Sequence, residues 1–64
     1  MFILIRDSEI HKVYVYNNLT PDAAEQLEFM LGESNSYGFF SSYRSDKPYD
    51  PAIAYEFLET GNVS

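Results

Sequence analysis

Residues 2–5, with the sequence FILI, most constrain what this chain can fold into. Successive side chains of a strand point to opposite faces of the sheet. A strand with one face in water alternates apolar and polar residues, whereas four apolar residues in a row need cover on both faces. We therefore expect this segment to be a strand that is covered on both sides or placed centrally in a sheet.

The length and the lack of cysteine limit how the fold can be stabilised. A chain of 64 residues forms one small domain, 1–64, and at this size folding removes only about 60% of the surface of the extended chain. With no cysteine, neither a disulfide nor a thiolate metal site can reinforce it. Five phenylalanines and six tyrosines supply large buried areas instead. Stability is thus expected to depend on aromatic packing or on self-association, for example as a homodimer.

Three segments have the composition of strands. Residues 1–6 and 10–16 are rich in β-branched and aromatic side chains and flank a short polar segment, which predicts a β-hairpin. A third strand is expected over residues 37–44. With two helical segments, the prediction is an α+β domain of order β-β-α-β-α, in which a three-stranded, mainly antiparallel sheet packs with two helices on one or both faces.

Capping residues mark both expected helices. The first begins at Pro21 behind Thr20 as N-cap, and Gly32 is its expected stop. The second has its N-cap and first position at residues 50–51 and its stop at Gly61. The apolar stripes of the two helices are then Ala23, Ala24, Leu27, Met30 and Leu31, and Ile53, Ala54, Phe57 and Leu58. The predicted core consists of Ile3, Ile5, Val13, Val15, Leu27, Leu31, Phe40, Ile53 and Phe57.

The sequence carries no motif for catalysis, a metal or a cofactor. His11 is the single histidine, and a zinc site of one histidine plus carboxylates would be an unusual set. Carboxylate pairs such as Glu25 with Glu28, or Glu56 with Glu59, lie on helix faces where we expect them to be solvated. No serine lies in a nucleophile elbow, and the three glycines are isolated. We expect a protein that is not an enzyme, with no catalytic residue, cofactor or metal.

The charge is strongly negative and unevenly distributed. Ten carboxylates against four cations give a net charge of −6, which argues against direct binding of nucleic acid or of an anionic membrane. Stacking of single-stranded bases on Tyr37, Phe39 and Tyr43 is the alternative to packing of these rings in the sheet, and packing is the simpler explanation. Both expected helices lack lysine and arginine. Such helices either keep a small domain soluble or form an acidic surface for a basic partner.

The N-terminal apolar run is short. After Met1 only four apolar residues precede Arg6 and Asp7. This is too short for the core of a signal peptide and far too short to span a bilayer. We therefore expect a cytoplasmic protein.

Phe29 breaks the amphipathic pattern of the first helix. At about 100° per residue it lies almost opposite the apolar stripe, among Asp22, Glu25, Gln26 and Glu33. Two explanations are structural: the helix is packed on both sides, or it is rotated so that Phe29 joins the edge of the core. The first would bury carboxylates at a large desolvation cost. The third explanation is an exposed aromatic anchor ringed by carboxylates, which resembles a binding hot spot.

These observations favour a small acidic protein-interaction module, an inhibitor or regulator that docks on a basic site of a larger protein. That protein could be a nucleic-acid-processing enzyme, blocked in the manner of small phage proteins whose carboxylates mimic phosphates. The alternative is a structural or self-assembling subunit that forms a homo-oligomer through aromatic surfaces. The expected interface residues are Phe29, Asp22, Glu25, Gln26, Glu28, Glu33, Tyr55, Glu56 and Glu59.

Overall fold

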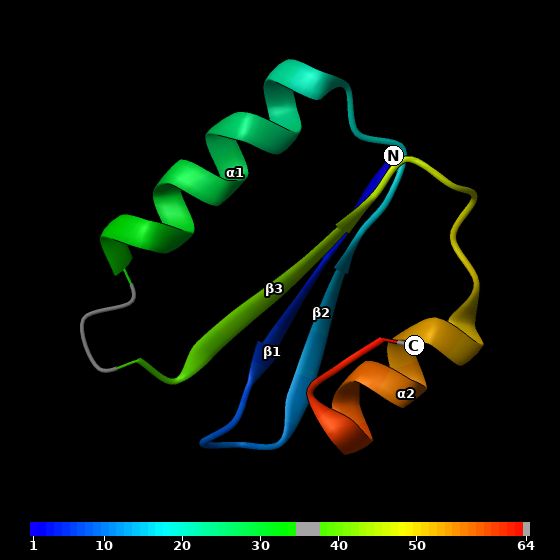
Figure 1. Cartoon of the computed structure of the whole chain (residues 1–64). Helices are drawn as coiled ribbons and strands as arrows, with labels where there is room; N and C mark the ends of the chain where they lie inside the picture. Colours follow the sequence, from blue (N-terminus) through cyan, green and yellow to red (C-terminus); the bar gives the residue numbers. More distant parts are fainter. Residues whose placement is uncertain (35–37, 64) are drawn as a thin grey trace.

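The computed structural model describes residues 1–34 and 38–63, and the elements follow the order β-β-α-β-α (Figure 1). The elements are β1 (Phe2–Asp7), β2 (Lys12–Tyr16), α1 (Pro21–Ser34), β3 (Phe40–Ser45) and α2 (Pro51–Thr60). The strands form one antiparallel sheet in the order β2-β1-β3. The predicted fold class and element order are confirmed.

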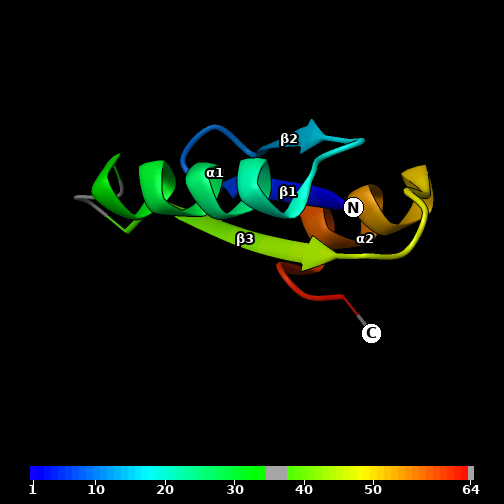
Figure 2. The ribbon, with the colours of Figure 1, turned by 90° about the horizontal axis from the view of Figure 1, so that it is seen from above.

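The central strand β1 is buried on both of its faces. Figures 1 and 2 show α1 on one side of the sheet and α2 on the other. Residues 2–5 are all buried, with exposed fractions between 0% and 6%. We expected this strand to be covered on both sides or placed centrally; both are the case, and the expectation is confirmed.

The face of the sheet toward α2 has a core of aromatic rings. Phe2 and Leu4 of β1 are buried there with Phe57 of α2. The ring of Phe2 lies 6.1 Å from that of Tyr43 and 5.5 Å from that of Tyr49, measured between centroids, and Tyr43 lies 6.3 Å from Phe57. Ring pairs at about 4.5–7 Å are favourable beyond the area they bury. Tyr43 is thus used for packing, as the simpler explanation predicted.

The opposite face is covered by α1. Ile3 and Ile5 of β1 are buried against Ala24, whose exposed fraction is 0%. Leu27 and Leu31, one and two turns further along α1, are half-buried against the same cluster. These spacings of three and four residues place the three α1 side chains on one side of the helix.

The ends of α2 have the predicted caps. The carboxylate of Asp50 accepts a hydrogen bond from the backbone N–H of Ala52 at 3.0 Å, and Pro51 follows at the first helical position. At the other end Gly61 has φ 74°, in the left-handed region, and its N–H donates to the carbonyl of Phe57 at 2.8 Å. Both helix boundaries are therefore confirmed.

Arg6 ties α2 to the sheet. Its Nε donates a hydrogen bond to the carbonyl oxygen of Leu58 in the last turn of α2, at 3.0 Å. A cation at the C-terminal end of a helix also complements the negative end of the helix dipole. Arg6 therefore supplies the positive charge that α2 itself lacks.

The predicted end of α1 is wrong. The helix begins as expected, with the N–H of Ala23 donating to Oγ1 of Thr20 at 3.2 Å, but it continues through Gly32 to Ser34. Among the described glycines only Gly38 and Gly61 have positive φ. Gly32 keeps a helical conformation because a glycine inside a helix costs only about 1 kcal/mol, which neighbouring turns can offset.

The strand boundaries differ from those predicted by one to three residues. Asp7 belongs to β1, and its Oδ1 accepts a hydrogen bond from the N–H of Glu9 at 3.0 Å, which starts the turn. Ile10 and His11 lie in that turn, Ile10 with 57% of its surface exposed, so β2 begins later than expected. The third strand begins at residue 40 and ends at residue 45, and Tyr37, the first residue of its expected range, lies outside the described residues.

The predicted core is correct at its centre and wrong at one edge. Val15 is 42% exposed, because it lies on the edge strand β2 beside the buried Leu4. On α1, Met30 is 62% exposed and Ala23 is also exposed, so neither belongs to the buried stripe. The buried apolar residues missing from the prediction are Phe2, Leu4 and Ala24. The predicted core residues that prove to be half-buried are Val13, Leu27, Leu31, Phe40 and Ile53.

Truncation of β1 should be far more damaging than a change on β2. We expect Leu4→Ala to lower the free energy of unfolding by about 2–5 kcal/mol, because it leaves a cavity in the fully buried centre. Val15→Thr should lower it by less than about 1 kcal/mol, since this side chain is largely exposed. Urea denaturation followed by circular dichroism measures both, and equal losses would contradict the assigned core.

Gly32, inside α1, and Gly61, at the end of α2, should respond oppositely to substitution by alanine. Gly32→Ala should stabilise the fold by about 0.5–1 kcal/mol, because the residue is helical and an added Cβ would meet nothing within 4 Å. Gly61→Ala should destabilise it by about 1–2 kcal/mol, because its φ of 74° is strained for a residue with a Cβ. Urea denaturation measures the free energy of unfolding of both variants. A destabilised Gly32→Ala variant would argue against the continuation of α1 through Gly32 to Ser34.

Candidate interaction surface

The outer side of α1 carries two large exposed apolar side chains. Phe29 is 67% exposed and Met30 is 62% exposed. Together with Asp22, Glu25 and Gln26 they line a shallow, open depression. These five positions follow the spacing of successive helical turns, so their side chains are neighbours along one side of the helix. We call these five residues the α1 surface.

The exposure of Phe29 excludes the two structural explanations for its position. α2 lies on the far side of the sheet, so it does not cover the outer side of α1 (Figures 1 and 2). Rotation toward the core is also excluded, because Ala24, Leu27 and Leu31 occupy the side of α1 that contacts the sheet. Phe29 therefore stands in solvent among polar neighbours.

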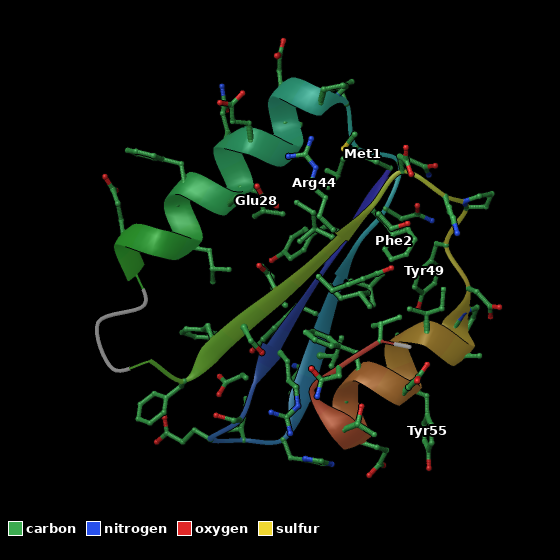
Figure 3. All side chains as sticks on the ribbon, in the orientation of Figure 1. Met1, Phe2, Glu28, Arg44, Tyr49 and Tyr55 are labelled. Atoms are coloured by element: carbon green, nitrogen blue, oxygen red, sulfur yellow. The ribbon has the colours of Figure 1, made fainter. Side chains whose placement is uncertain are left out.

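Glu28 faces a different neighbour from the rest of the expected interface. Its Oε2 lies 3.4 Å from Nη1 of Arg44 on β3, and Figure 3 shows the two side chains between α1 and the sheet. The pair is partly exposed, and such pairs contribute little to stability. It does compensate the charge of Glu28, which is therefore not part of the α1 surface. Glu33 is exposed near the end of the helix.

The three α2 residues of the expected interface lie on the other side of the molecule. Tyr55 is 67% exposed and points away from the sheet (Figure 3). Glu59 is exposed and Glu56 is half-buried on the same helix. The structure does not bring these residues next to Phe29, because α1 and α2 lie on opposite faces of the sheet. The expected extension of one acidic surface over both helices is therefore wrong; each helix has its own.

A second apolar surface was not anticipated from the sequence. It is a groove between α1 and the sheet, beside β2. We call it the tyrosine groove, and it is lined by Ile5, Tyr14, Tyr16, Leu27, Met30, Leu31 and Phe40. Met30 belongs to both surfaces, so the groove adjoins the α1 surface. The signal for it was the pair Tyr14 and Tyr16, which share one face of β2 by the two-residue period of a strand.

Apolar side chains line most of both surfaces, and the α1 surface also carries two carboxylates. Across residues 1–34 and 38–63, no three histidine, aspartate or glutamate side chains are grouped so that they could hold a metal ion. In the same part of the chain, neither helix has the length and apolar character needed to cross a membrane.

Comparison with protein-family models, with curated proteins and with solved structures finds no match.

Proposed function

We propose that the protein is a small interaction module that docks its α1 surface on a basic site of a larger protein and thereby inhibits or regulates that protein. The observation that carries the proposal is the 67% exposure of Phe29 on a side of α1 where carboxylates surround it. An apolar anchor within a charged rim is the usual arrangement of a binding hot spot.

Phe29 and Met30 supply the apolar part of the contact. An aromatic side chain has few rotatable bonds, so its immobilisation costs little entropy for the area that it buries. Met30 beside it is flexible and adapts to the shape of a partner's pocket. Together they give a compact apolar centre that a pocket on a partner could enclose.

Asp22 and Glu25 supply the charge of the rim. Within the part of the chain that the structure describes, neither carboxylate has an ion-pair partner, in contrast to Glu28. Their charge is therefore available to a basic partner. The net charge of −6 adds a long-range attraction that speeds the encounter with such a partner.

The basic site could belong to a nucleic-acid-processing enzyme. Carboxylates three residues apart on a helix have Cβ atoms about 5–6 Å apart, which gives a row of negative charges on a rigid support. Sites that bind phosphates are built from lysine and arginine, and such sites also accept carboxylates. In its more specific form, the proposal is that these carboxylates occupy the phosphate-binding site of such an enzyme and inhibit it by mimicking phosphates, in the manner of small phage proteins.

Phe29→Ala and Tyr55→Ala form a matched pair, because both side chains are 67% exposed and they lie on opposite faces of the molecule. We expect each change to alter the free energy of unfolding by less than about 0.5 kcal/mol. Phe29→Ala alone should weaken binding by about 2 kcal/mol or more, roughly 30-fold.

The measurement is a quantitative pull-down from a lysate of the native host with the wild-type chain and both variants, followed by the affinity for the protein identified by mass spectrometry. Proteins lost with Phe29→Ala and retained with Tyr55→Ala are expected. If both variants retain the same proteins as the wild type, the α1 surface is not the docking site.

The salt dependence of binding tests the role of charge. The association rate should fall as salt rises above about 0.1 M, where the Debye length is near 10 Å. Glu25→Lys should flatten this dependence more than Glu59→Lys, because the two variants have the same net charge and only Glu25 lies on the α1 surface. Stopped-flow kinetics measures the rates. A rate that does not change with salt would leave only the apolar contacts to explain binding.

A further inference from the structure

The outer edge of β2 is open. β2 lies at one edge of the sheet, with β1 on its inner side and no strand beyond it among the described residues (Figure 2). Such an edge is a template for pairing with another strand, and proteins usually block it with proline, a bulge or inward-pointing charges. The sequence of β2, KVYVY, has none of these apart from Lys12 at its first position.

A hydrogen bond made by Ser8, the residue that follows β1, shows which residues of β1 bond to β2. Within an antiparallel sheet, the N–H and C=O of a residue point to the same side, and this side alternates along the strand. The N–H of Ser8 donates to the carbonyl of Phe39 at 3.0 Å, on the side of β3. Even-numbered residues of β1 therefore bond toward β3 and odd-numbered residues toward β2.

This alternation identifies the backbone groups at the open edge. Ile5 is paired with Tyr14, so Tyr14 bonds inward to β1, as do the first and last residues of β2. Val13 and Val15 then direct their N–H and C=O groups outward. Val15 is also 42% exposed at its side chain, and Tyr16 is 40% exposed.

We propose that β2 pairs with β2 of a second copy of this chain, antiparallel and centred on Tyr14, to form a homodimer with a continuous six-stranded sheet. In this register Val13 of each copy lies opposite Val15 of the other, and the outward groups of both residues meet as hydrogen-bonded pairs. Tyr14 lies opposite Tyr14, and Lys12 lies opposite Tyr16. This interaction is separate from the one proposed for the α1 surface. A negative result for one of the two proposals does not affect the other.

The side chains of β2 favour a second copy as the occupant of this edge. Each chain has a net charge of −6, but β2 itself contains no carboxylate, so pairing brings no carboxylate into the contact, and the antiparallel register places the two lysines at opposite ends of it. The side-chain pairs of the register are valine with valine, tyrosine with tyrosine, and lysine with tyrosine. The last pair has a precedent within the chain, where Nζ of Lys12 lies 4.9 Å from the ring centroid of Tyr14.

Side-chain burial adds to the backbone pairing. Residues opposite each other in an antiparallel pair lie on the same face of the sheet. Tyr14 of the second copy would therefore lie beside Tyr14 on the face that carries the tyrosine groove. The open flank of this groove, formed by Tyr14 and Tyr16, would be covered in the dimer.

The oligomeric state of the full chain tests the proposal, with Val15→Pro and Val15→Thr as a matched pair. Light scattering across a concentration series should show a dimer for the wild type and for Val15→Thr. Val15→Pro removes an outward N–H while leaving the bonds to β1, and proline is tolerated where a strand's N–H faces solvent. Its dissociation constant should rise at least about tenfold, because two hydrogen bonds are lost per dimer. A wild-type chain that stays monomeric, or a folded Val15→Pro variant that dimerises normally, would overturn the proposal.

Cross-linking tests the register. It also tests the β2–β2 pairing itself in the case that the Val15→Pro variant does not fold. The chain has no cysteine, so Tyr14→Cys introduces a single thiol. Two such thiols would face each other at a non-hydrogen-bonded position, where Cα atoms are about 4.5 Å apart, within the range of a disulfide. Mild oxidation should cross-link Tyr14→Cys much faster than Tyr55→Cys, whose thiol lies on the exposed side of α2. Equal rates for the two variants would overturn the proposed register.

Discussion

Burial of β1 on both faces is the constraint from which the rest of the structure follows. Residues 2–5 need an apolar layer on each side of the sheet, and the chain has two helices, so each face receives one. A helix is about 10 Å across, and strands are spaced about 4.8 Å apart, so one helix covers about two strands. Three strands therefore cannot be fully covered. The open flank of the tyrosine groove is a consequence of this mismatch.

The same arrangement decides where the charge lies. Because α1 and α2 lie on opposite faces, the carboxylates of the two helices cannot join into one surface, although six of the ten carboxylates of the chain lie in these helices. Two of the four cations contact the helices: Arg6 caps the end of α2, and Arg44 pairs with Glu28 of α1. The sheet thus compensates the inner side of each helix, while Asp22 and Glu25 on the outer side of α1 stay exposed to solvent.

Features set by local sequence were predictable, and features set by strand order were not. Asp50 and Gly61 end α2 as expected because capping depends on a few neighbouring residues. Helical periodicity places Phe29 opposite the apolar stripe of α1, but its 67% exposure also depends on α2 lying on the other face of the sheet. The exposure of Val15 depends on which strand is central, and the separation of Tyr55 from Phe29 depends on which face each helix covers. Pairings between distant segments decide both, and no short pattern records them.

The two proposed interactions have a geometric relation if both exist. Antiparallel pairing through β2 places the same faces of both sheets on the same side, so the two copies of α1 would also lie on one side of the dimer. Each copy would present Phe29 with its carboxylates there, and the dimer would carry twice the charge of the chain. A partner with two basic sites at a matching distance would then bind more tightly than either site alone, because the second contact is intramolecular. A partner with one site would gain nothing from the dimer, so the β2 edge would determine which class of target is held most tightly.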